Sequence, residues 1–340
     1  MVSSRLMTAL RDWRFHRNFW VLILTWILFK FERDISFTFL PDYIVALGGS
    51  EAAIGLASMI GQLFFIPVGI MGGYIGDYYG RRDIVVKMTW AIAFSTLLYV
   101  IAPTWWFIPV ALSIESLSRV YIPALHAIFA DSMKPEVRAK GFMMSHILPD
   151  VLALPAPALG GFIIEYLGYG KPFSYRVVYI IAFSMSLIAA LIRHLMLVET
   201  LSGYRRAPLL KVLIESLRLG VKDFIKTIPL APKAAIAISL LNSIFYMLPL
   251  GMVLPYMIRY AGLNGIDSGT WGTIISITIG VSVIVGIVML RILDLIDRRV
   301  LLILSILGFS LGLYMFSRGD FNSILFGTIM YYGVFSRIYD

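Results

Sequence analysis

Apolar residues in this chain fall into ten long runs, and a short polar or turn-forming segment separates each run from the next. The runs are close to 20 residues or longer, which is about the length that an α-helix needs to cross a bilayer. Gly48-Gly49, Pro103 and Lys134-Pro135 mark three of the breaks. The pattern predicts ten transmembrane helices, at about 18–46, 51–75, 84–102, 105–130, 141–167, 174–198, 234–261, 268–290, 300–317 and 322–340.

The composition supports a bilayer as the solvent of this chain. Of the 340 residues, 59% are hydrophobic and 14% are charged, and the mean hydropathy is +0.84. Soluble domains carry about 25% charged residues, so a soluble helical protein fits poorly. We therefore predict an all-α integral membrane protein.

Basic residues are unevenly divided between the two ends of the predicted helices. If the N-terminus is cytoplasmic, the inner segments hold 20 of the 29 Lys and Arg residues and the outer segments hold 4. This asymmetry follows the positive-inside rule. The net charge of +9 therefore indicates topology, and no nucleic-acid partner is expected. We predict a multi-pass protein of the plasma (inner) membrane with a cytoplasmic N-terminus.

The segment 200–233 differs from its surroundings, because it is basic and its apolar residues recur at helical spacing. It predicts an amphipathic helix on the inner membrane surface; a linker in solution is the alternative. The segment divides the chain into an N-terminal six-helix bundle at 1–199 and a C-terminal bundle of four helices at 234–340. The apolar positions are Leu209, Val212, Leu213, Leu217, Val221, Phe224 and Ile228.

A charged segment occurs once in each half, and other landmarks repeat in the same order. An acid precedes an arginine pair in Asp77-Tyr-Tyr-Gly80-Arg81-Arg82 and again in Asp294-Leu-Ile-Asp-Arg298-Arg299. Leu40-Pro41 is repeated as Leu254-Pro255, and Ser118 to Tyr121 as Ser336 to Tyr339. Such repeats are typical of internally duplicated transporters. By its own repeat, the chain is expected to hold ten of twelve helices.

These features together resemble the major facilitator superfamily. The first charged segment is similar to the family's loop between helices 2 and 3, although Tyr78 stands where a basic residue is usual. The resemblance implies two helix bundles related by a pseudo-two-fold axis, alternating access and a monomer. It also implies a gating role for the charged segments. The alternative is that their arginines only keep the loop on the inner side of the membrane. The implied gating residues are Gly73, Asp77, Gly80, Arg81, Arg82, Asp294, Arg298 and Arg299.

Helix 5 carries a second element of the resemblance. Ala156-Pro157-Ala-Leu-Gly160-Gly161 is similar to a G-P-x-x-G-G element of the family's antiporters, with Ala156 in place of the first glycine. We expect Pro157, Gly160 and Gly161 to serve helix packing. The element favours antiport.

Charged residues inside the predicted spans are candidates for proton coupling, because burying a charge in a bilayer is costly. Static ion pairs such as Lys30–Asp34 or Glu115–Arg119 are the alternative. Neutral groups in the second half are candidates for substrate contacts, namely Asn242, Tyr246 and Ser276. Arg193 and His194 are expected to extend toward the inner surface. The coupling candidates are Glu32, Arg33, Asp34, Glu115, Arg119, Asp150 and Arg337.

Motifs for other chemistry are missing from the sequence. It contains no cysteine, no phosphate-binding loop and no spaced metal ligands, so we expect no enzyme, cofactor or metal. We expect a secondary active transporter of a small molecule, working by proton-coupled antiport or efflux. Proton symport of a sugar, an organic acid or a similar metabolite is the alternative. A receptor or scaffold that does not transport is the alternative of another class.

Overall fold

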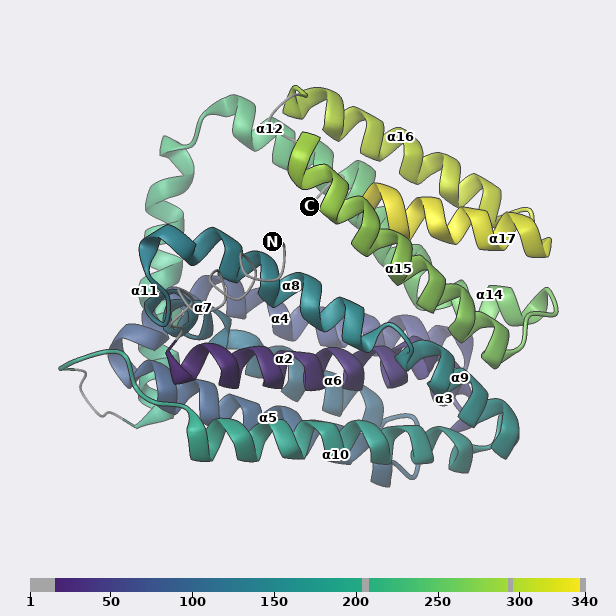
Figure 1. Cartoon of the computed structure of the whole chain (residues 1–340), viewed down its shortest axis with the longest axis horizontal. Helices are drawn as coiled ribbons and strands as arrows, with labels where there is room; N and C mark the ends of the chain where they lie inside the picture. Colours follow the sequence, from purple (N-terminus) through teal and green to yellow (C-terminus); the bar gives the residue numbers. More distant parts are fainter. Residues whose placement is uncertain (1–15, 204–207, 293–295, 337–340) are drawn as a thin grey trace, which may run out of the picture.

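The chain is all-helical and has no strand within residues 16–203, 208–292 and 296–336, the part that the computed structural model describes (Figure 1). Helices occupy all ten predicted spans. Seven are long and apolar enough to cross a membrane, and Val300–Phe316 and Phe321–Phe335 are shorter apolar helices. The first span differs because Lys30, Glu32, Arg33 and Asp34 lie near its middle.

The first six spans form a bundle, which we call the N-bundle (Figure 1). Several of its helices are interrupted near prolines, which cannot donate a backbone hydrogen bond. Its elements are α2 (Arg17–Ser36), η1 (Phe37–Phe39), α3 (Leu40–Ala46), α4 (Glu51–Tyr79), α5 (Arg81–Ile101), α6 (Phe107–Ser118), η2 (Arg119–Tyr121), α7 (Ile122–Asp131), η3 (Pro135–Val137), α8 (Arg138–Ala153), α9 (Ala156–Leu167) and α10 (Pro172–Met196).

The later spans, which we call the C-helices, pack along one side of the N-bundle (Figure 1). The linker helix α11 (Leu209–Thr227) and the turn η4 (Ile228–Leu230) connect the two parts. The C-helices comprise α12 (Lys233–Asn242), η5 (Ser243–Met247), α13 (Leu248–Val253), η6 (Leu254–Tyr256), α14 (Met257–Leu263), α15 (Ser268–Ile292), α16 (Arg298–Phe316), α17 (Phe321–Thr328) and η8 (Ile329–Phe335).

The repeated Leu-Pro landmarks have the same structural effect in the two halves. Leu40-Pro41 follows the 3₁₀ turn η1, and Leu254-Pro255 lies within the 3₁₀ turn η6. Each therefore breaks the first span of its half near one end. We call this the outer end and the opposite one the inner end, after the topology predicted from the sequence. This agreement supports the internal duplication seen in the sequence.

The charged segment between spans 2 and 3 is not the loop that the sequence predicts. Helix α4 continues to Tyr79 and α5 begins at Arg81, so Gly80 alone separates them. The backbone of Gly80 has φ +94°, a region that residues with a Cβ rarely adopt. The sequence-based boundaries missed the extra helical turns because their polar residues ended the apolar pattern.

The two parts meet closely at the outer end, where α9 lies against α15. A Cβ on Gly161 would lie 2.1 Å from the carbonyl oxygen of Ser268, and one on Gly272 would lie 2.2 Å from that of Pro157. Only glycine permits this approach. One core cluster joins both parts here, including Tyr43 of α3 and Trp271 of α15. From this end, α15 and α16 diverge from the N-bundle toward α11 (Figure 1).

Candidate functional site

A cavity of about 420 Å³ lies in the N-bundle and contains most of the ionisable residues predicted from the sequence. Residues of α2, α6, η2 and α8 supply its charges, and aromatic side chains supply much of the remaining wall. It is lined by Trp26, Phe29, Lys30, Glu32, Arg33, Ser36, Phe37, Ile92, Tyr99, Glu115, Arg119, Tyr121, Ile122, Leu125, His126, Ser145, His146, Pro149, Asp150 and Tyr179.

Two acids on one side of the cavity share a lysine. Lys30 forms an ion pair with Asp34 one turn along α2. Its Nζ also lies 3.5 Å from a carboxylate oxygen of Asp150 on α8. The pair predicted from the i, i+4 spacing is therefore part of a three-residue cluster that joins spans 1 and 5.

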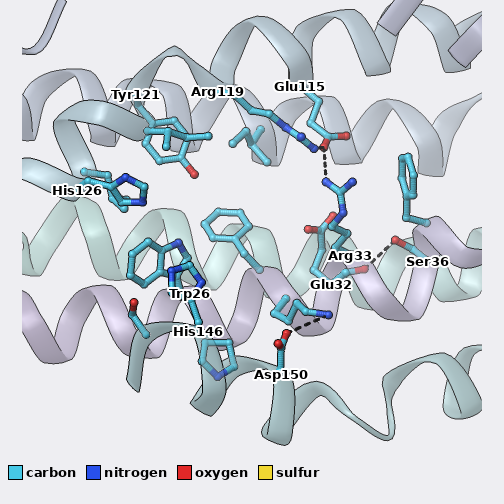
Figure 2. A pocket seen from close by; sticks show the side chains of 18 of the residues that line it. Trp26, Glu32, Arg33, Ser36, Glu115, Arg119, Tyr121, His126, His146 and Asp150 are labelled. Atoms are coloured by element: carbon cyan, nitrogen blue, oxygen red, sulfur yellow. Dashed lines mark hydrogen bonds and ion pairs between the residues drawn. The ribbon is translucent and has the colours of Figure 1, made fainter. Parts of the chain in front are cut away.

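A second cluster surrounds Glu115 of α6. Arg119 donates a hydrogen bond to its carboxylate at 2.7 Å, and Arg33 approaches the same oxygen at 3.7 Å. The hydroxyl of Tyr99 donates to the other oxygen at 3.4 Å. Figure 2 shows both guanidinium groups pointing at this carboxylate from different helices. Glu115 therefore carries two positive neighbours.

Glu32 differs from Glu115 and Asp150, the other two acids that line the cavity, and from the neighbouring Asp34. Among the residues that the structure describes, no basic group forms an ion pair with it within 4 Å; the hydroxyl of Thr96 donates to its carboxylate at 3.4 Å. Tyr179 also lines the cavity, and its buried hydroxyl has no hydrogen-bond partner in the described part of the chain. Glu32 is therefore the acid whose charge is least compensated by its surroundings.

The inner ends of spans 2 and 3 are tied to neighbours within the N-bundle. Arg81 pairs with Asp131 of α7 at 2.5 Å. The backbone N–H of Arg82 donates to Glu199 at 2.9 Å, and its side chain donates to the carbonyl oxygens of Leu197 and His194.

Most other residues of the charged segments have side chains outside the described part of the structure. Gly73, Asp77, Arg298 and Arg299 lie in helices, but their side chains are outside the described part of the structure, and Asp294 and Arg337 lie outside the described residues altogether. The gating role of these segments stays a prediction.

The remaining candidates lie away from the cavity. Gly160 of helix 5 faces the carbonyl oxygen of Ile35, so Gly160 and Gly161 lie between spans 1 and 8. Ser276 accepts a hydrogen bond from the backbone of Ala158 at 3.1 Å, which places it in the α9–α15 contact. Tyr246 is buried against Phe309. Their role in substrate contact stays a prediction, as does that of Asn242, whose side-chain oxygen is buried.

Arg193 does not extend to the inner surface as predicted, because it is fully buried. It donates to the hydroxyls of Thr25 and Thr89 at 3.0 Å each. Its guanidinium also lies over the rings of Phe29 and Tyr121, at 4.9 and 5.5 Å from their centroids. The prediction failed because Arg193 is on the face of α10 that packs against α2 and α5. His194, one residue on, is exposed.

An outer cluster that the sequence analysis missed connects the two parts of the protein. Arg259 of α14 pairs with Asp42 of α3 at 3.2 Å and with Glu51 of α4 at 2.9 Å. Tyr169, in the turn between α9 and α10, donates to Asp42 at 3.2 Å. Burial, with the nearby Asp42, raises the pKa of Tyr169 to about 12, so this hydroxyl stays protonated. The sequence did contain a signal for this cluster, because acids occur at the outer ends of spans 1 and 2 and a base occurs at the outer end of span 7.

Comparison with known proteins links this architecture to membrane transport. The family model of the Major Facilitator Superfamily matches residues 20–337. The chain is 25% identical over 184 residues to a Na(+), Li(+), K(+)/H(+) antiporter of Planococcus maritimus, which covers 51% of this chain and 42% of the relative. It is 24% identical over 156 residues to the uncharacterized MFS-type transporter YqjV of Bacillus subtilis (strain 168), covering 44% and 38%. The matched part thus spans about two fifths of each relative.

Solved transporter structures share the fold. A mutant of the nucleoside transporter NupG matches with a TM-score of 0.69 and 16% identity, covering 95% of this chain and 81% of that one. The partially occluded inward open xylose transporter XylE from E. coli matches with a TM-score of 0.68 and 15% identity, covering 95% and 84%. At this level of identity the likeness shows a shared fold and does not identify the substrate of this chain.

Proposed function

The chain belongs to the Major Facilitator Superfamily, and on this premise we propose that it is a secondary active transporter that exchanges protons for a small cation, with Glu32 as the shared binding group. The observation that carries the proposal is a contrast between Glu32 and the acids in and beside the cavity. Glu115, Asp150 and the neighbouring Asp34 each have a basic partner, whereas the carboxylate of Glu32 accepts from a hydroxyl. A carboxylate without a counter-ion inside a membrane span is costly. Glu32 therefore holds either a proton or a cationic ligand.

Exclusive binding of one or the other leads directly to exchange. A substrate cation that reaches Glu32 displaces the proton, and the proton displaces the substrate when the cavity faces the other side. The aromatic residues Trp26 and Tyr99 in the cavity wall favour a cation, because ring faces attract positive charge. The name of the Planococcus maritimus relative, a cation/proton antiporter, supports the same class of substrate.

Alternation of access follows from the arrangement of the two parts. The outer end is held by the Arg259 cluster and by the glycine contact of α9 with α15. Toward α11 the C-helices diverge from the N-bundle (Figure 1). We propose that this is an inward-facing state, and that rocking of the two parts opens the outer end while closing the inner one.

Proton symport of an anionic metabolite is the second candidate. The side chain of Arg33 is 45% exposed although it lines the cavity, and Arg119 lies beside it. Two guanidinium groups at a cavity wall can bind a carboxylate or a phosphate. In this case the proton and the substrate would move in the same direction.

Flux in vesicles separates these candidates. The protein is reconstituted with an imposed pH gradient, and fluxes of Na⁺, K⁺, a fluorescent organic cation and a small organic acid are followed. Antiport predicts cation flux opposite to the proton flux, and its loss in Glu32→Gln. Glu136→Gln, which changes an exposed inner acid, is the matched control and should behave as the parent. Flux of the organic acid in the direction of the protons would establish symport, and driven cation flux in Glu32→Gln would overturn the role of Glu32.

A further inference from the structure

The linker helix α11 presents three distinct faces. Val212, Ser216 and Gly220 are buried, and they follow one another at intervals of four residues. At Gly220 the contact with α4 is backbone to backbone, because an added Cβ would lie 2.4 Å from the carbonyl oxygen of Ile70. The position of α11 is thus tied to the inner half of α4. Figure 1 shows α11 running across the inner ends of the N-bundle helices.

A second face of α11 is apolar and uncovered in the part of the chain that the structure describes. Leu210, Ile214 and Phe224 are 70%, 61% and 55% exposed. At 3.6 residues per turn they lie on one stripe together with Leu217, Val221, Ile225 and Ile228. A stripe of this length is well suited to insertion among lipid tails at the bilayer surface.

The third face is charged, and its charges are ordered. Lys211, Arg218 and Lys222 are spaced by seven and four residues, so they line the flank next to the apolar stripe. The acid Glu215 lies next to this basic row and pairs with Lys211 at 3.9 Å, whereas Asp223 lies farther round the helix. A hollow of about 470 Å³ opens beside Arg218 and Lys222, and Ser216 and the acid Glu215 also line it. If the apolar stripe is inserted among lipid tails, these basic groups lie at the level of the headgroups.

We propose that α11 binds anionic phospholipid headgroups of the inner leaflet through Lys211, Arg218 and Lys222, with its apolar stripe inserted among the lipid tails. Positive charge beside an inserted stripe complements the negative surface of that leaflet. Through the contact of Gly220 with Ile70, bound lipid anchors the inner half of α4. The inference rests on the proposed orientation, with the linker on the inner side, and does not depend on proton coupling.

A single label on the apolar stripe tests the lipid contact directly. The chain has no cysteine, so Ile214→Cys gives one site for a fluorophore in the full-length protein. The label is read in vesicles that contain equal fractions of brominated phosphatidylglycerol or brominated phosphatidylcholine. We expect quenching by both lipids, with anionic lipid preferred by roughly fivefold or more.

Matched double variants separate charge recognition from insertion alone. Arg218→Gln with Lys222→Gln should abolish the preference for phosphatidylglycerol while leaving quenching by phosphatidylcholine. Lys134→Gln with Lys140→Gln removes two exposed inner charges outside α11 and should retain the preference. Equal quenching by both lipids in the parent would overturn the proposal. Quenching of the label by a water-soluble quencher would also overturn it, because the stripe would then face water. A further contrary result is dipolar coupling between spin labels attached at the same cysteine of two molecules, which would show that a second copy covers the stripe.

Discussion

The guanidinium of Arg259 lies 3.2 Å from the carboxylate of Asp42, and this pair joins the first span of one half to the first span of the other. The side chain of Asp42 is 2% exposed, whereas that of Arg259 is 22% exposed. The contact therefore combines a buried acid with a base that reaches water. It is placed to hold the outer end closed.

Arg259→Gln should loosen the outer end. The change leaves the buried carboxylate of Asp42 without its counter-ion, which costs on the order of 2 kcal/mol, less than for a fully buried pair because Arg259 is partly exposed. This is enough to shift a two-state equilibrium more than tenfold toward the outward-open form. In a Met257→Cys background, labelling by an impermeant maleimide from outside should rise.

Arg318→Gln is the matched control, because Arg318 is an exposed outer base. It should leave the labelling of position 257 unchanged. Equal labelling of the Arg259→Gln variant and the parent would show that the pair does not hold the outer end closed.

Gly161→Ala should disrupt the contact between α9 and α15. The added methyl group would lie 2.1 Å from the carbonyl oxygen of Ser268, and a backbone atom cannot turn aside as a flexible side chain can. We expect a lower melting temperature and slower flux. Gly251→Ala, with no atom within 4 Å of the added Cβ, should change neither. If both variants melt as the parent does, the close approach is not needed.

The ten spans were predictable because hydrophobic runs and turn residues are local features. The pairs Lys30–Asp34 and Glu115–Arg119 were also predictable, since residues four apart share a helix face. The outer cluster was not, because Asp42 and Arg259 are distant in sequence and meet only when the two halves pack. The burial of Arg193 likewise depends on which face of α10 meets its neighbours.

Glu115→Gln and Asp150→Asn test whether the paired acids take part in coupling. Each variant keeps its size but removes a negative charge from a cluster that contains arginine or lysine. We expect flux driven by a pH gradient to be lost and counterflow exchange to remain, because exchange needs no net proton movement. Counterflow is measured with labelled substrate at equal pH on both sides. Normal driven flux in both variants would remove these acids from coupling.

The stability of the first turn of α17 should depend on pH, because Asp320 caps this helix. Hydrogen bonds from Ser323 hold the pKa of this exposed acid below its ordinary value. The cap is therefore fully present above the pKa of the unfolded chain and is lost as the pH falls through the lower folded value. Amide exchange over residues 321–324, corrected for its intrinsic pH dependence, should accelerate at acid pH in the parent. Asp320→Asn, which caps without titrating, should show no such change.

Two substitutions of Arg193 distinguish how its buried charge and its hydrogen bonds each affect the stability of the protein. No carboxylate pairs with it among the described residues, so Arg193→Met leaves no orphaned charge. Thr25 and Thr89 keep their own bonds to the carbonyl oxygens of Val21 and Val85. Replacing a buried charged group by an apolar one of similar volume is often neutral or stabilising.

Arg193→Lys instead keeps the charge but loses the planar guanidinium and its stacking on Phe29 and Tyr121. We expect the melting temperature of Arg193→Met to equal or exceed that of the parent and that of Arg193→Lys to fall below it. The reverse order would mean that the positive charge itself stabilises the N-bundle.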